Sequence, residues 1–388
     1  MDRRVGVLAL FSVSVSLIFV IRGIIEHDAG ASEAGLLYVF WPLIYTFIVA
    51  GLTSRRVLVG AQRVLVLATI VIGVYGMSYV LVQLRVLPSS LFIPLFPQGE
   101  AIGLYSGYVE SNLYSFNSFP FLIPFVMAAL VTYPPSHPDP PVPRTCLWLS
   151  LALGLTLILV SGRRALFVVV PFAFLVMLVL KLFANPRAKR VTWRELAKLV
   201  FAVVVTSLAF AQYMSTVYDF SWAAVLRMVS SGFAFNSGGA DLGAQIRSDQ
   251  YSALIAAWAQ SPVLGAGHGA SVAGLVRDWE RPWSYELYYV ALLFQVGILG
   301  TLAYAAGVLW IYWRGVRILK EGGPFGELML CNLVGLSGML LVNATNPVLP
   351  RFDGLWALFL PISVINAWLL QPRHKESAIY SPSHFFLG

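Results

Sequence analysis

The residues best suited to chemistry lie between positions 245 and 300, where a polar stretch leads into a long apolar one. Arg247 comes first, and Glu286 follows at the head of the apolar run, close to Trp283. A carboxylate among aromatic rings at the edge of an apolar segment loses hydration, which raises its pKa toward the range of a general base. An acidic residue in the first turn of a helix can instead only complement the helix dipole, and that alternative stays open.

Arg247 belongs to a predicted helix in which Arg247, Tyr251, Leu254 and Trp258 recur at spacings of four, three and four. Residues at these spacings share one face, so the guanidinium is expected to lie along the face that packs. An arginine fork binds phosphate in a bidentate way and stays charged when partly buried. The alternative is an amphipathic helix at the membrane interface whose arginine extends to water or pairs with an acid such as Asp249.

A glycine-rich turn, Pro-Val-Leu-Gly-Ala-Gly-His-Gly, follows at 262–269. Such a turn lets backbone N–H groups approach an anion closely, but it is also an ordinary way to end a helix. His268 within it is a candidate acid or base, or else a hydrogen-bonding surface residue.

Two adjacent arginines, Arg163 and Arg164, follow Ser161 and Gly162 at the junction of two apolar runs. With no acid beside them in the sequence, their burial at a membrane boundary is energetically costly unless an anion or a distant carboxylate neutralises their charge. The alternative is a pair that extends to lipid headgroups.

The elements that must position these residues are membrane helices. Hydrophobic residues make up 58% of the 388 residues and charged residues 11%, against about a quarter in ordinary globular proteins. Apolar runs of the length that a bilayer requires predict an all-α integral membrane protein with about ten transmembrane helices. The predicted spans are 5–25, 34–52, 64–84, 115–133, 145–160, 165–183, 196–214, 284–313, 328–342 and 355–370.

The loops between these spans predict the orientation. Every lysine, and most arginines outside the membrane, fall in the loops of one side, which the positive-inside rule assigns to the cytoplasm together with both termini. The net charge of +8 is thereby explained without nucleic acid. The predicted division of the chain is 1–214 with seven spans and an interfacial segment near 85–114, a large outer loop at 215–283 with amphipathic helices, and 284–388 with three spans and a cytoplasmic tail.

Several of these residues together resemble a known family. The pattern Pro262-x-x-Gly265-x-Gly267, with Arg247 before it and a second motif after it, is similar to the signature of the O-antigen polymerase and O-antigen ligase superfamily. The second motif consists of Tyr289, Val290, Leu293, Gln295, Gly297, Ile298, Leu299 and Gly300. The motif portion covers about a fifth of the chain, and the rest matches in layout only. Ligases of this superfamily have His-Asn where this chain has Glu286-Leu287, and that departure favours the polymerase.

The resemblance implies a glycosyltransferase of the GT-C kind, independent of metal and cofactor, at the periplasmic face of a bacterial inner membrane. Its donor and acceptor would be oligosaccharides linked to undecaprenyl pyrophosphate, with membrane lipids around it and a chain-length regulator as a candidate protein partner. Arg247, Arg163 and Arg164 would bind the donor pyrophosphate, and Glu286 would be the catalytic base. Supporting roles fall to His268, Arg281, Arg351 and Tyr289. The competing hypotheses are an O-antigen ligase and a transporter of lipid-linked oligosaccharide.

Overall fold

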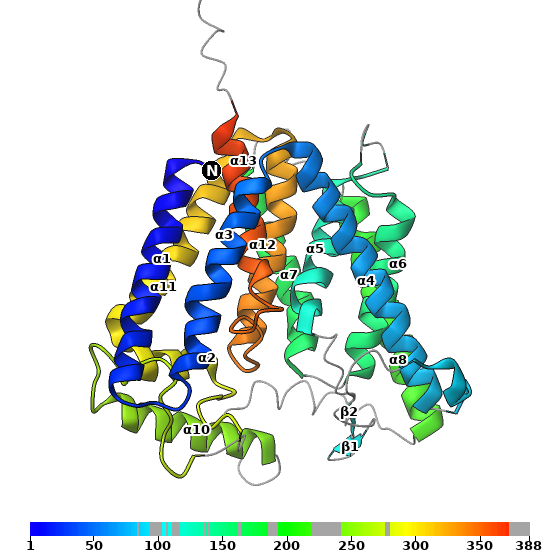
Figure 1. Ribbon diagram of the computed structural model, residues 1–388. Helices are drawn as coiled ribbons and strands as arrows, with labels where there is room; N and C mark the ends of the chain where they lie inside the picture. The colour runs from blue at the N-terminus through cyan, green and yellow to red at the C-terminus, as the bar shows by residue number, and fades with distance from the viewer. Residues whose placement is uncertain are drawn as a thin grey trace, which may run out of the picture.

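The computed structural model describes residues 1–83, 85–93, 103–105, 108–110, 117–135, 137, 140–161, 164–184, 193–218, 242–275 and 280–371. It is a bundle of long helices that run side by side (Figure 1). Six of them are long and apolar enough to cross a membrane, and three shorter apolar helices stand among them. The protein is therefore an all-α membrane protein, as predicted, while the number of ten spans and the GT-C fold remain predictions.

The helices overlap the predicted apolar runs, except α10, which lies in the predicted outer loop. They are α1 (Arg3–Ile25), α2 (Ala31–Gly35), the π-helix η1 (Leu36–Phe40), α3 (Trp41–Gly51), α4 (Arg55–Gln83), α5 (Phe119–Thr132), α6 (Arg144–Val160), α7 (Arg164–Phe183), α8 (Trp193–Tyr218), α10 (Leu242–Trp258), α11 (Tyr288–Glu321), α12 (Gly323–Asn343) and α13 (Trp356–Leu370). The one predicted span at 34–52 is built from α2, η1 and α3, which follow one another without a gap.

The centre of the bundle is the contact between α5 and α12. Every residue of α5 from Phe119 to Val131 is buried, and most of α12 is buried as well. Glycines on α12 make this close approach possible, because a Cβ on Gly338 would overlap the backbone carbonyl of Pro120 and one on Gly335 would press on Phe121. Small residues at helix contacts are the usual way in which membrane helices pack closely.

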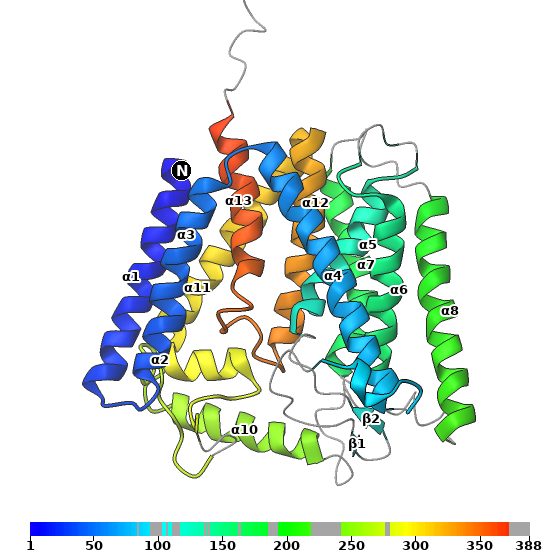
Figure 2. The ribbon, with the colours of Figure 1, turned by 45° about the vertical axis from the view of Figure 1, so that its right-hand side comes forward.

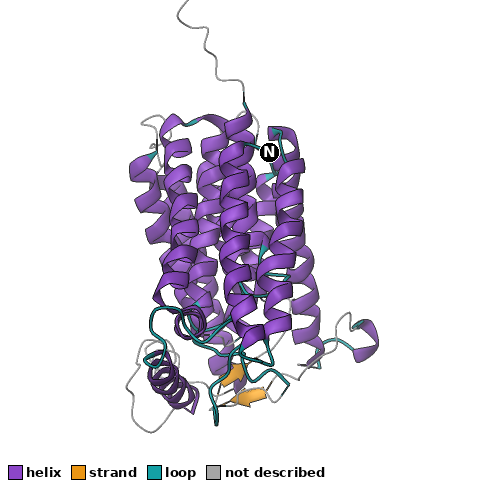
Figure 3. Cartoon of the chain, turned by 60° about the vertical axis from the view of Figure 1, so that its left-hand side comes forward, coloured by secondary structure: helices purple, strands orange, loops and turns teal. Residues whose placement is uncertain are grey.

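The two ends of the bundle differ. The amino terminus lies at one end, called here the N-terminal end, and α10 lies across the other, called here the α10 end (Figure 1). A short hairpin of β1 (Gly103–Tyr105) and β2 (Tyr108–Glu110) also lies at the α10 end (Figure 3), next in the chain to a 3-10 turn at Ser89–Leu91. At its described residues, the predicted interfacial segment near 85–114 therefore consists of a 3-10 turn and a hairpin, and it does not span the bundle.

Helix α11 is broken near its beginning. Gly297 has φ 63° and ψ −170°, which is not helical, and the backbone turns there. Residues before the break lie across the α10 end of the bundle, and residues after it run along the bundle, as the yellow and gold segments of Figure 2 show. The predicted single span at 284–313 is therefore two helical pieces, and the second continues to Glu321.

Candidate functional site

Arg247 and Glu286 meet at the α10 end. Nη1 of Arg247 lies 3.8 Å from Oε2 of Glu286, and the two side chains are 28% and 20% exposed. Arg247 is on α10, and Glu286 is two residues before the start of α11. The sequence predicted both residues for one site, and the structure brings these two together. Glu286 is paired with a cation rather than enclosed by aromatic rings alone, as its sequence neighbours had suggested.

The face of α10 that packs on the bundle is close to the predicted one. Leu254 is fully buried and Trp258 is partly buried, as the spacing indicated. Tyr251 does not belong to this face, because it is 53% exposed. Gln250 takes its place at 1% exposed, and its Oε1 accepts a hydrogen bond of 3.1 Å from the backbone N–H of Glu286.

The glycine-rich turn at 262–269 supplies hydrogen-bond partners to the backbone at the break in α11. The N–H groups of Ala266 and Gly267 donate to the carbonyls of Phe294 and Gln295, at 3.0 and 2.8 Å. In the other direction, the N–H groups of Ile298 and Leu299 donate to carbonyls in the turn, at 2.9 and 3.1 Å. Backbone groups left open by a broken membrane helix must find partners within the protein, and this turn supplies them.

This pairing decides between the two interpretations of the turn. The N–H of Gly265 donates to the Ser261 carbonyl and that of His268 to the Phe19 carbonyl, so each N–H from Gly265 to His268 is used inside the protein. An anion-binding role for these groups is therefore wrong. The glycines are needed for another reason. Gly265 has φ 67°, and a Cβ on it or on Gly297 would overlap the other segment's backbone.

His268 is a buried structural residue. It is fully buried, its ring stacks on Tyr38 at 4.1 Å between centroids, and its Nε2 lies 2.9 Å from the hydroxyl of Tyr304. Its Nδ1 lies 3.3 Å from the side-chain oxygen of Gln295. Burial lowers the pKa of His268 to about 4, so the ring is neutral near pH 7. Neither the predicted catalytic role nor a place on the surface agrees with these contacts.

The other predicted residues are distributed as follows. Arg163 and the side chain of Arg164 lie outside the described residues. Arg281 pairs with Glu33 at 3.6 Å, and Arg351 lies 3.9 Å from Asp353. These two arginines are therefore matched with acids other than Glu286.

Tyr289 borders a cavity. Its hydroxyl donates to the Leu340 carbonyl at 2.7 Å, and with Tyr288 it lines an apolar cavity of about 260 Å³ between α1, η1, α3, α11 and α13. The cavity follows α1 from Val5 to Ser16, which is about 17 Å at the rise of an α-helix. Among the described residues that line it, none is an acid, a lysine, an arginine or a histidine.

No family model matches the chain, and no curated protein is significantly similar to it.

Two features of this site were missed by the sequence analysis. Gln250 was overlooked because an amide carries no charge, although its spacing of three from Arg247 was visible. The break at Gly297 was overlooked because the apolar run continues through it. The paired occurrence of Gly265-x-Gly267 and Gln295-x-Gly297 was the one available signal.

Proposed function

We propose that this protein is a glycosyltransferase that joins lipid-linked oligosaccharide repeat units into a polysaccharide, as O-antigen polymerases do. The observation that carries the proposal is the Arg247–Glu286 pair, held at one end of a membrane bundle by α10 and by the short first piece of α11. In this proposal the α10 end faces the periplasm of a bacterial inner membrane, and both termini are cytoplasmic. The substrates are oligosaccharides on undecaprenyl pyrophosphate.

The chemistry assigned to the pair is a single displacement. The hydroxyl oxygen of the acceptor sugar forms a bond to the anomeric carbon of the donor while the bond from that carbon to the pyrophosphate oxygen breaks. Glu286 takes the proton of the hydroxyl, undecaprenyl pyrophosphate leaves, and the anomeric configuration inverts. The leaving group gains negative charge as the bond breaks, so a fixed arginine stabilises the transition state more than the ground state. Arg247 fits this role because it is a partly exposed cation that lies 3.8 Å from Glu286, the proposed base.

The cavity argues for chemistry at one end rather than transport of the pyrophosphate. A transporter needs polar or charged groups along a path through the membrane. The cavity between α1 and α13 has only apolar and hydroxyl side chains among its described lining residues, so it offers the pyrophosphate no counter-charge. Between the two enzymes, Glu286-Leu287 in place of His-Asn favours the polymerase over the ligase.

Loss of the gene tests this proposal. In cells without the protein, lipopolysaccharide is expected to carry single repeat units, because the ligase still works while the polymerase is missing. If no repeat unit reached the lipopolysaccharide core, the ligase would be the better assignment. Lipopolysaccharide with polysaccharide chains of unchanged length would reject both the polymerase and the ligase assignment.

The residue roles are tested by complementation. Glu286→Gln keeps the size of the side chain but removes the base, and it is expected to leave only single units. Glu280→Gln is the matched control, because Glu280 is an exposed carboxylate of the same loop. Protein in the membrane is measured for each variant. Full-length chains from Glu286→Gln would remove Glu286 from the mechanism.

A further inference from the structure

Gln250 holds the backbone beside the proposed base. The N–H of Glu286 precedes α11, and N–H groups at the beginning of a helix have no carbonyl of that helix to pair with. Gln250 supplies the acceptor, at 3.1 Å, from a side chain that is 1% exposed. Because the Gln250 side chain is buried, water has little access to the acceptor of this hydrogen bond.

The same helix face makes a second contact with the same residue. Arg247, Gln250 and Leu254 lie at spacings of three and four, so they share one face of α10. Leu254 is fully buried and anchors that face on the bundle. Arg247 meets the carboxylate of Glu286 while Gln250 meets its backbone. Two contacts from one rigid helix fix both the position and the direction of the Glu286 side chain.

We infer that Gln250 is a positioning residue for Glu286, and this inference rests on the proposed function. An amide suits this task better than a carboxylate would. Glutamate at 250 would keep an acceptor for the Glu286 N–H, but it would place a second negative charge beside Glu286 and compete for Arg247. The uncharged side chain leaves Arg247 to Glu286 and, during the reaction, to the pyrophosphate.

The expected size of the effect follows from the geometry of catalysis. Misplacement of a reacting group by about 1 Å can slow a reaction roughly 100-fold. The Gln250 hydrogen bond is made to the backbone of the proposed base, so the change is expected in kcat rather than in KM.

The experiment uses the full-length protein in lipid nanodiscs. The substrate is lipid-linked oligosaccharide extracted from cells that lack the protein, and polymer formation is followed over time and pH. Gln250→Leu removes the acceptor at similar size, and Gln250→Glu keeps an acceptor and adds charge. Gln245→Leu is the matched control, because Gln245 is an exposed residue of the same helix. Hydrogen exchange at the amide of Glu286 is measured for each protein.

Gln250→Leu is expected to lower kcat roughly 10- to 100-fold with KM within about twofold, and to speed exchange at the Glu286 amide. Gln250→Glu is expected to keep that amide protected but to move the acidic limb of the rate profile to higher pH, because a neighbouring negative charge disfavours a second one. Gln245→Leu should match the wild type in all respects.

Three results would count against these ideas, and they differ from one another. If the wild type forms no polymer, the proposed function fails, whatever the exchange data show. If the wild type is active and Gln250→Leu keeps its kcat, the positioning role is overturned. If Gln250→Leu does not accumulate, Gln250→Glu decides alone, and a rate profile identical to that of the wild type rejects the inference.

Discussion

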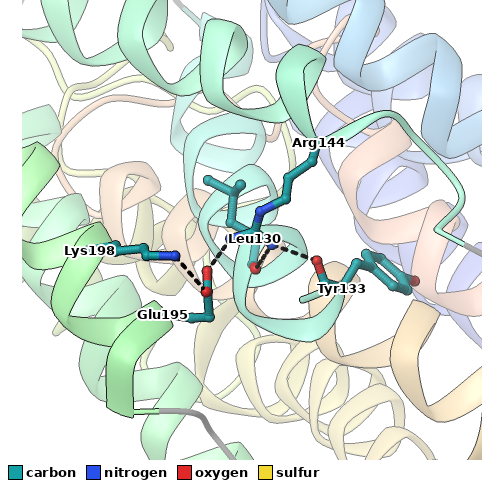
Figure 4. A network of polar contacts seen from close by, with 5 residues as sticks. All are labelled: Leu130, Tyr133, Arg144, Glu195 and Lys198. Atoms are coloured by element: carbon teal, nitrogen blue, oxygen red, sulfur yellow. Dashed lines mark hydrogen bonds and ion pairs between the residues drawn. The ribbon is translucent and has the colours of Figure 1, made fainter. Parts of the chain in front are cut away.

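Two arginine–glutamate pairs lie at opposite ends of this bundle, and they are built differently. At the N-terminal end, Arg144 contacts Glu195 and also donates to the carbonyls of Leu130 and Tyr133, at 3.1 and 2.7 Å (Figure 4). Lys198 adds a second cation to Glu195 at 2.9 Å. The Arg144 guanidinium therefore ties the end of α5 to the beginnings of α6 and α8.

The Arg247–Glu286 pair is more exposed than the Arg144–Glu195 pair. Its atoms are 3.8 Å apart, both side chains are partly exposed, and the carboxylate is held through its backbone by Gln250. The Arg144 pair connects three helix ends, whereas the Arg247 pair lies partly exposed at the α10 end. The same two residue types thus serve folding at one end and, in our proposal, chemistry at the other.

The largest contrast is expected from alanine at the two arginines. Arg247→Ala should lower polymer formation by roughly 100- to 1,000-fold, the loss typical of a group that stabilises transition-state charge, with little change in stability. Arg144→Ala should lower the free energy of unfolding by about 3 kcal/mol, because Glu195 stays buried with one of its two cations removed. Polymer assays and thermal unfolding in detergent measure both. The comparison is contradicted if Arg247→Ala mainly lowers the free energy of unfolding and Arg144→Ala mainly lowers polymer formation.

The pairing of the turn with α11 can be broken without touching either charge. Gly265→Ala adds a Cβ at φ 67° that overlaps the backbone of Gln295 and Gly297, so a loss of about 3 kcal/mol in stability is expected. Gly274→Ala is the control, because Gly274 has φ 79° but no atom of the described residues lies within 4 Å of its Cβ position. Equal thermal unfolding of these two variants would show that strain, not the contact with α11, sets the loss.

Acid should weaken the α10 end through His268. The pKa of this histidine is about 4 in the folded protein and about 6.5 in an unfolded chain, so the unfolded chain binds the proton first. The histidine's contribution to stability is complete above about pH 6.5 and is lost as the pH falls toward 4. Between pH 7 and pH 5 the wild type should lose about 2 kcal/mol more than His268→Gln. If thermal unfolding shows the same loss of stability between pH 7 and pH 5 in the wild type and in His268→Gln, the ring of His268 is not buried and neutral.

The smallest effect is expected at the exposed arginines. Arg281→Ala removes an ion pair in which Arg281 is 55% exposed, and such pairs contribute at most about 1 kcal/mol. Polymer length and the midpoint of thermal unfolding should stay close to those of the wild type. A loss of polymer as large as that of Arg247→Ala would show that Arg281 supports the reaction, the role that the resemblance implied for it.

The sequence predicted the positions of the helices better than the break within α11. Each apolar run became a helix because hydrocarbon leaves the backbone no other partners, and length and composition reveal this. The break at Gly297 depends on hydrogen bonds from a turn about thirty residues earlier in the chain, which no local pattern encodes.

For the site, the shared polar stretch and the family resemblance predicted that Arg247 and Glu286 belong to one site. They were not enough for His268, whose surroundings come from α1, η1 and α11 at once. A histidine in a glycine-rich stretch looks exposed in the sequence, and only the folded contacts show that it is enclosed.

The hydrogen bonds between the turn and α11 have a consequence for folding during synthesis of the chain. The segment at 262–267 leaves the ribosome before α11 does, yet its partners for hydrogen bonding are on α11. The amides of Ile298 and Leu299 find their acceptors on that earlier segment. Completion of α11 at its break is thus coupled to the loop before it, which must be in place when α11 folds.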